Sequence, residues 1–337
     1  MDNRITKRRL SDFLAYEWIL TLVFVAVAVV VLELVYSIAA TRLSTGQQFK
    51  YYYDQNIFTH TEGGSLYDLL GVNYGENGKT FSYDVLSVET ETLLSSYNVL
   101  TTRLSVQEGD AVFTSSNVDS DEKVRAKSII DGEAPVYRMD KLLSDAEDYL
   151  ARFLTDGETD VYNADGYDED KIRAYFDMRM KNDNRFRTEQ SKEKGRQDEI
   201  GRITKLAAEV KDFKKLMDTG EAKGLFYRYT RYEQATETDT SREEAFKNAY
   251  QREKDEGREN AVYGFNLAAL TAPAAAGKRD VSAYFKLSVQ DAAGNIRTDA
   301  SDVVLLVFDF LSYQPDLQFE TISFINTIVR EFSDFLD

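Results

Sequence analysis

The sequence predicts an α/β protein preceded by a single membrane-spanning helix. Three observations carry this prediction: an apolar run at 18–40, alternating strand-like and helix-like segments at 48–114, and helical apolar stripes in a charged part at about 141–217. Together they divide the chain into a basic tail at 1–17, the membrane helix, and an α/β domain at 45–337 that carries the charged helical part as an insertion.

The apolar run is long enough to cross a bilayer. At 1.5 Å per residue, its 23 residues span the roughly 30 Å of a hydrocarbon core. The positive-inside rule then predicts a cytoplasmic N-terminus and an extracytoplasmic C-terminal domain, in a single pass through the cell membrane. The single charge within the run, Glu33, lies near its outer end, where we expect the carboxylate to snorkel toward the interface. The basic residues that set this orientation are Arg4, Lys7, Arg8 and Arg9.

A cleaved signal peptide is the alternative interpretation of the same segment. Its apolar core would be Ile19–Leu32, and its small-residue cleavage site would be Ser37–Ala39. We favour the anchor because signal-peptide cores run to about 7–15 residues and this apolar run resumes after Glu33.

The composition excludes several classes of function. After Arg42 the chain holds 36 Lys and Arg against 54 Asp and Glu, so the domain repels nucleic acid and anionic lipid headgroups. It has no cysteine and one histidine, His60, which excludes disulfides, thiol nucleophiles and the common zinc sites. No catalytic residue, metal or cofactor is predicted, and we expect a protein that is not an enzyme.

The first part of the domain has an order of strands and helices that is typical of a parallel sheet. Residues 48–58, 81–88 and 110–114 are predicted strands, and apolar residues at helical spacing predict a helix at 90–106. A strand, a connection, a strand, a helix and a strand indicate parallel neighbours.

The middle of the domain changes to helix. Apolar stripes predict helices at 142–154, 172–180 and 200–216. The heavily charged residues 181–199 are more typical of a solvated face or an exposed helical arm than of a binding site.

The last part returns to a mixed pattern. Residues 234–260 indicate a loop or a mobile helix, and 283–289 and 303–308 indicate strands separated by a turn at 291–295. The chain closes with an amphipathic helix at 320–335.

Two motifs resemble ligand loops without completing them. Residues 73–80, NYGENGKT, lack the first glycine of a P-loop and lead into a strand, so a hairpin-like loop is favoured. Residues 161–172, VYNADGYDEDKI, lack the acid at both ends of a calcium loop, and a capped helix start explains the same residues.

A ligand of this domain would bind past the carboxyl ends of the parallel strands, where open α/β sheets leave a crevice. We expect the strand-end residues to line one concavity facing the segment 263–270. The alternative for Asp54 and Ser115 is that they are ordinary turn and cap residues. The candidate ligand-binding residues are Tyr53, Asp54, Glu89, Thr114 and Ser115.

Three segments carry a resemblance to a known family. Leu94–Ser115, Tyr263–Leu270 and the closing helix ETISFINTIVREF resemble parts of the extracellular solute-binding proteins of bacterial ABC importers. The resemblance covers about 45 residues. It implies a periplasmic-binding-protein lobe, a small-molecule ligand such as a sugar or another nutrient, and ABC permease subunits as partners.

The chain also departs from that family. Family members usually have a cleaved lipoprotein signal with a cysteine and exceed this chain in length, so the chain resembles a shortened, membrane-anchored relative. Two other functions stay open from sequence. One is a structural module that assembles with a transporter or envelope complex without a small molecule. The other is a carboxylate-based hydrolase, because a suitable pair of acids can come from anywhere in the chain.

Overall fold

The chain forms two compact units, Met1–Ser44 and Thr45–Asp337. The computed structural model describes residues 7, 11, 13, 18–39, 48–54, 57–58, 66, 80–81, 87–93, 97–116, 124–132, 135–234, 243–270, 277–290, 296–309 and 319–337. The predicted turn at 291–295 lies outside these residues, as does the predicted loop at 73–80 apart from its last residue, Thr80.

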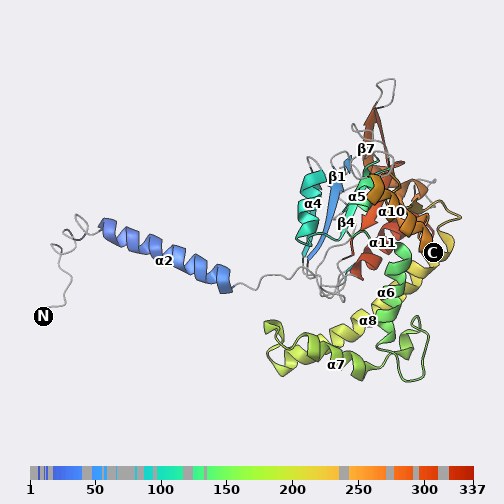
Figure 1. Ribbon diagram of the computed structural model, residues 1–337. Helices are drawn as coiled ribbons and strands as arrows, with labels where there is room; N and C mark the ends of the chain where they lie inside the picture. Colours follow the sequence, from blue (N-terminus) through green and yellow to red (C-terminus); the bar gives the residue numbers. More distant parts are fainter. Residues whose placement is uncertain are drawn as a thin grey trace. The chain divides into compact units, whose positions relative to one another are not determined.

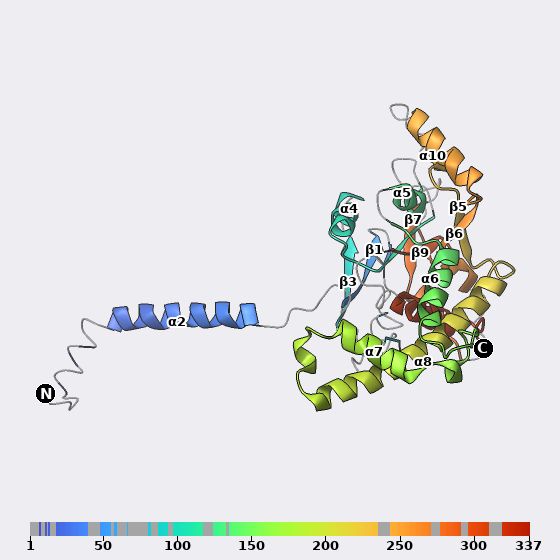
Figure 2. The same ribbon diagram turned by 60° about the horizontal axis from the view of Figure 1, so that its bottom comes forward.

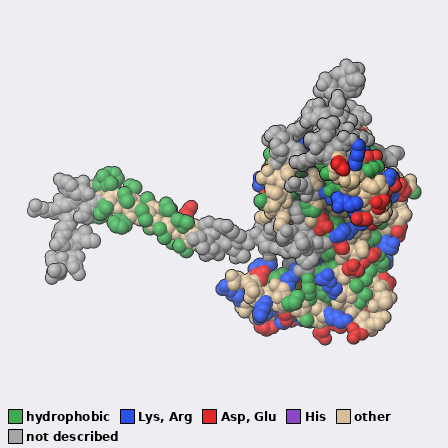
Figure 3. Space-filling view, viewed as in Figure 1, with side chains coloured by type: hydrophobic (Ala, Val, Ile, Leu, Met, Phe, Trp, Pro, Cys, Tyr) green, Lys and Arg blue, Asp and Glu red, His purple; other side chains and the backbone are tan. Residues whose placement is uncertain are grey.

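The first unit contains the helix α2 (Trp18–Ala39). Its window Trp18–Val35 is long and apolar enough to cross a membrane, and none of that window is buried inside the structure. Figure 3 shows its almost uniformly apolar surface. The sequence explains this helix, because its residues include no proline or glycine and present apolar side chains all round.

The second unit is a mixed α/β domain built on a six-stranded sheet (Figure 1). Strands β3, β1 and β4 are parallel, as predicted, and β9 pairs with β4 in the antiparallel direction. In spatial order the strands are β3 (Ser87–Leu93), β1 (Gln48–Asp54), β4 (Ala111–Ser115), β9 (Val303–Val307), β6 (Ala261–Asn266) and β5 (Phe226–Tyr229).

A smaller antiparallel sheet lies beside β1 and β4. It consists of β2 (Ile57–Phe58), β7 (Lys286–Gln290) and β8 (Ile296–Asp299). The predicted strand at 48–58 is therefore two strands in two sheets. The strand predicted at 283–289 begins at Lys286, because the three residues from Val281 form a 3-10 turn capped by the side chain of Asp280.

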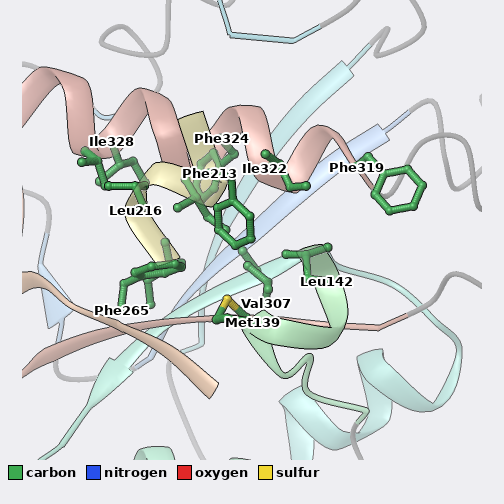
Figure 4. Close-up of a cluster of buried hydrophobic side chains, with 14 of the residues drawn as sticks. Met139, Leu142, Phe213, Leu216, Phe265, Val307, Phe319, Ile322, Phe324 and Ile328 are labelled. Atoms are coloured by element: carbon green, nitrogen blue, oxygen red, sulfur yellow. The ribbon is translucent and has the colours of Figure 1, made fainter. Parts of the chain in front are cut away.

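Helices cover both faces of the main sheet. The helices α4 (Tyr97–Ser105) and α5 (Arg125–Asp131) belong to one buried cluster, around Tyr52 and Val112. The opposite face packs against a larger cluster, part of which is drawn in Figure 4. The helices that contribute to this larger cluster are α6 (Met139–Ala151), α8 (Glu189–Thr219) and α11 (Glu320–Phe332). A further helix, α10 (Glu243–Asp255), lies between β5 and β6 in the chain.

A helical hairpin projects from the domain, and we call it the arm. It consists of α7 (Glu169–Arg179), a 3-10 turn at Asn184–Phe186 and the first half of α8, as Figures 1 and 2 show. The two helices approach closely at Gly195, where a Cβ atom would lie 2.3 Å from the ring of Phe176. This arm confirms the helical arm expected at residues 181–199, most of which are exposed or half-buried, although Gly195 and Glu199 are buried.

Two predicted boundaries are wrong in the first part of the domain. The second strand runs over Ser87–Leu93 rather than 81–88, and the following helix begins at Tyr97 rather than at residue 90. The segment 87–93 pairs with all seven residues of β1. Its alternating β-branched residues suit this ladder, although Leu93 also fits the helical spacing of the residues that follow.

Candidate functional site

The carboxyl ends of four strands meet at one edge of the main sheet. Strands β1, β3 and β4 are parallel, and β6 runs in the same direction because β4 and β6 both pair antiparallel with β9. From β1 the chain passes to β3 on one side and then to β4 on the other, so the strand order reverses at β1. Open α/β sheets bind ligands at such an edge. We call it the carboxyl edge.

Two residues predicted for the carboxyl edge are core residues. Tyr53 is 4% exposed and its ring stacks on Phe113, with the ring centroids 5.4 Å apart. Burial raises the pKa of the Tyr53 hydroxyl well above its ordinary value. Thr114 is completely buried on the other face of the sheet. Neither side chain is presented to solvent, so the accessible part of the edge consists of other residues.

Short polar groups follow β4 at this edge. Ser115 is half-buried, and the backbone N–H and Oγ of Ser116 both donate hydrogen bonds to the carbonyl oxygen of Asp302, at 2.9 and 3.2 Å. These bonds join the end of β4 to the turn that precedes β9. The sequence pattern indicated Ser115 but gave no signal for Asp302, which is brought here by the antiparallel pairing of β9.

Asn266 extends the carboxyl edge across β9. It is the last residue of β6 and pairs with Val304, which on its other side pairs with Thr114. Strands β4 and β6, which lie on either side of β9, are therefore about 10 Å apart, twice the usual strand spacing. The Asn266 Oδ1 accepts a hydrogen bond from the N–H of Ala268 at 3.1 Å. The end of β6, which lies within the segment 263–270, is therefore at the predicted edge.

Asp54 and Glu89 have different positions in the sheet. Asp54 ends β1 and pairs with Leu93, and its side chain lies outside the described part of the structure. The prediction that Glu89 lies at the carboxyl edge is wrong, because Glu89 is the third residue of β3 and pairs with Lys50 near the other end of the sheet.

Glu89 instead belongs to an ionic cluster around Lys50. The Lys50 Nζ lies 2.6 Å from Glu108, 3.2 Å from Glu91 and 3.8 Å from Glu89. Arg103 bridges two of the same carboxylates, at 2.9 Å from Glu108 and 3.4 Å from Glu91. The hydrogen bond from Lys50 holds the pKa of Glu108 below its ordinary value. The basic and acidic side chains of this cluster pair with one another, so the cluster connects the α4–β4 turn to β1 and β3.

Asp110 completes the connection between that turn and β1. Its Oδ2 accepts a hydrogen bond from the Lys50 N–H at 2.7 Å, and its own N–H donates to the Lys50 carbonyl at 2.7 Å. Desolvation raises the pKa of the Asp110 carboxyl to about 7, although the hydrogen bond from the Lys50 backbone acts in the opposite direction. The folded domain therefore takes up a proton here between pH 3.8 and about 7.

We expect Asp110→Asn to remove a pH-dependent loss of stability. Because the unfolded carboxyl ionises near pH 3.8 and the folded one near pH 7, wild-type stability falls as pH rises through this window and then levels off. The asparagine side-chain oxygen can still accept the hydrogen bond from the Lys50 N–H. We therefore expect the free energy of unfolding of the variant to exceed that of the wild type by about 2 kcal/mol at pH 8, a value reduced for partial solvent screening. Urea unfolding of both chains between pH 4 and 8 measures the difference.

Glu108→Gln is the matched control for that experiment. The folded-state pKa of Glu108 is lowered, so its stabilising contribution is lost as pH falls and its replacement costs most at neutral pH. The two variants should therefore diverge from the wild type in opposite directions. A constant difference between Asp110→Asn and the wild type at every pH would contradict the assignment.

Polar residues of the partial calcium loop have structural partners. The Asp168 side chain caps α7 by accepting from the N–H groups of Asp170 and Lys171, and Asn163 caps the preceding 3-10 turn. This confirms the capped helix start. Among the described residues, no group of three or more His, Asp and Glu side chains is arranged to hold a metal ion.

Comparison with known proteins adds no family to these observations: no protein-family model, no curated protein and no solved structure matches the chain.

Proposed function

We propose that this chain is a membrane-anchored extracytoplasmic binding protein, with α2 as its single span and its N-terminus in the cytoplasm. The length of α2 and its largely apolar surface, interrupted by the single charge of Glu33, support the anchor. The basic residues before it support the orientation.

We further propose that the domain resembles a lobe of the solute-binding proteins of ABC importers and holds a small polar solute at the carboxyl edge. The observation that carries this proposal is the convergence of four strand ends where the strand order reverses. Ser115, Ser116 and Asn266 supply hydroxyl and amide groups that suit the hydroxyls of a sugar or the polar groups of another nutrient. ABC permease subunits are the corresponding partners.

A second candidate is a structural module that assembles with a transporter or envelope complex without a small molecule. The burial of Tyr53 and Thr114 favours it, because the domain's own side chains occupy positions that a ligand would use.

Protease protection tests the topology. Protease added to intact spheroplasts should digest Thr45–Asp337 and leave a membrane stub that contains α2. The same treatment of inverted vesicles should spare the domain. Recovery of the domain in the medium, starting near Ala40, would instead identify a cleaved signal peptide.

A thermal-shift screen of the full chain in nanodiscs separates the two functions. A bound solute at 100 times its dissociation constant adds roughly 2.7 kcal/mol of stability, so a cognate sugar, amino acid or peptide should raise the melting temperature. Asn266→Ala should abolish the shift, whereas Glu89→Gln, at the other end of the sheet, should preserve it. No shift with any class, together with co-purification of membrane proteins, would favour the structural module.

A further inference from the structure

The outer end of the arm carries a net positive charge, opposite in sign to the net charge of the whole domain. After Arg42 the chain holds 36 basic and 54 acidic residues, but the segment 178–192 holds five basic and two acidic ones. We call this segment the arm tip. In Figure 3, Lys and Arg side chains lie at this end of the arm.

Two of these cations are presented to solvent. Lys181 and Arg187 are both exposed, and within the described part of the chain neither has a carboxylate at ion-pair distance. The Arg187 guanidinium hydrogen-bonds the side-chain oxygen of Asn184 instead. Beside them Met178 is 67% exposed. The tip therefore combines outward-facing positive charge with an accessible apolar side chain.

Ion pairs and a helix cap within the arm hold the arm tip in place. Ion pairs join α7 to α8 along its length, between Arg173 and Glu193 at 2.7 Å and between Arg196 and Asp177 at 2.9 Å. The α8 helix starts in a capping box in which the side chains of Thr188 and Ser191 bond each other's backbone N–H groups. The positive charges are thus fixed on a helical hairpin.

The arm projects from the end of the sheet at which β1 begins. The Lys205 Nζ, in α8, donates hydrogen bonds to the carbonyls of Thr80 and Phe81, at 3.0 and 3.2 Å. The Phe81 ring lies 4.6 Å from that of Phe49, the second residue of β1. From Lys205 back to Glu189 the helix extends about 24 Å further. Figures 1 and 2 both show the arm beyond this end of the sheet.

That end of the sheet is also the one joined to the membrane anchor. Eight residues separate Ala39 from Gln48, and a chain of that length spans at most about 30 Å. Under the proposed anchoring, the start of β1 therefore stays within this distance of the membrane surface, a distance comparable to the reach of the arm.

We propose that the arm tip rests on anionic phospholipid headgroups of the membrane that anchors the chain, through Lys181, Arg187 and Lys192. This proposal depends on the proposed anchoring. Basic side chains near an anionic surface are attracted within a Debye length, about 8–10 Å at physiological salt. The acidic remainder of the domain is repelled by the same surface, so the tip is the part that approaches. Met178 supplies an apolar contact at the interface.

The absence of cysteine allows a direct measurement of this contact. The full chain carrying Gln190→Cys, an exposed position at the start of α8, is labelled with a fluorophore and placed in nanodiscs whose headgroups bear a quencher. A second single-cysteine chain, Asn248→Cys, places the same label on the exposed face of α10, far from the arm in Figures 1 and 2. Each chain is studied in discs with and without phosphatidylglycerol.

We expect quenching of the Gln190→Cys label in phosphatidylglycerol discs, and its loss in phosphatidylcholine discs or at high salt. The Asn248→Cys label should remain unquenched in both. Adding Lys181→Gln, Arg187→Gln and Lys192→Gln should abolish quenching of the first label, while an unchanged melting temperature shows that the domain is folded.

Two outcomes separate failure of this proposal from failure of the anchor. Chains that do not enter nanodiscs contradict the anchor itself. Chains that enter but show equal, lipid-independent signals from the two labels, or a signal that survives the three substitutions, overturn the contact between the arm tip and anionic lipid.

Discussion

Glu199→Ala should destabilise the domain by about 3–5 kcal/mol, the usual cost of removing one partner from a buried ion pair. The Glu199 side chain is fully buried at the base of the arm and accepts from two arginines. The Arg179 Nη2 lies 2.8 Å from the Glu199 Oε2, and the Arg202 Nη2 lies 2.9 Å from the Glu199 Oε1. The Arg202 guanidinium also donates a hydrogen bond to the Tyr149 hydroxyl. Alanine would remove the buried carboxylate that these two guanidinium groups share, and one of the two arginine side chains is only 1% exposed.

Denaturant unfolding of the full chain measures this cost, and Glu189→Ala provides the matched control. Glu189 also pairs with an arginine of α8, Arg196 at 3.0 Å, but its side chain is 75% exposed. Exposed pairs contribute about 0–1 kcal/mol, so the control should have little effect. Equal effects of the two substitutions would show that Glu199 is not an essential counter-charge.

A combined substitution tests the physical reason. Replacing Arg179 and Arg202 by Met and Glu199 by Leu removes the charges together and retains apolar volume at the base of the arm. Buried ionic groups replaced in this way often leave stability unchanged or increased, so the triple variant should recover most of what Glu199→Ala loses. If the triple variant is as unstable as the single one, the loss arises from packing rather than from uncompensated charge.

The sequence predicted those parts of the fold whose patterns are local. The apolar run of α2, the apolar stripe of α11 and the short continuous apolar run of β9 each follow from residues close together in the chain. Parallel pairing of the first three strands was also predictable, because a helix between strands requires a crossover.

The parts it missed depend on contacts between distant residues. The segment 87–93 becomes a strand because its glutamates face Lys50 of β1, a partnership that no local pattern reveals. Asn266 and Asp302 reach the carboxyl edge only because β9 inserts antiparallel between β4 and β6. Charge alone did not show which residues of 181–199 are paired and which remain at the arm tip.

The candidate site illustrates the same limit. Tyr53 and Thr114 were correctly placed near a strand end, but sequence alternation does not reveal whether another layer covers that end. Aromatic residues from other elements pack around Tyr53, among them Phe113 of β4. Burial of a strand-end residue is therefore a property of the whole fold rather than of its strand.

Gly109→Ala should be among the most destabilising small substitutions in the domain, at about 2–5 kcal/mol, from backbone strain and overpacking together. Gly109 has a φ of +107°, which residues with a Cβ atom rarely adopt. An added Cβ would lie 2.2 Å from the Tyr52 ring, which is completely buried and whose hydroxyl hydrogen-bonds the Glu108 carbonyl at 3.1 Å. The turn that directs the chain from α4 into β4 therefore has no room for a methyl group.

Gly201→Ala is the control that isolates this effect, because it makes the same chemical change in α8 where, apart from the helix's own backbone and the adjacent residues, no atom of the described residues lies within 4 Å of the added Cβ. Alanine is favoured over glycine in a helix by roughly 0.8–1 kcal/mol, so Gly201→Ala should stabilise the domain while Gly109→Ala destabilises it. Adding Tyr52→Leu to Gly109→Ala then separates the two causes. Relief of the clash should appear as a coupling energy between the two substitutions, and the remaining loss is the cost of the positive φ. Unfolding curves of the four chains provide the cycle, and additive effects of the two substitutions would show that contact with Tyr52 is not what requires glycine at this turn.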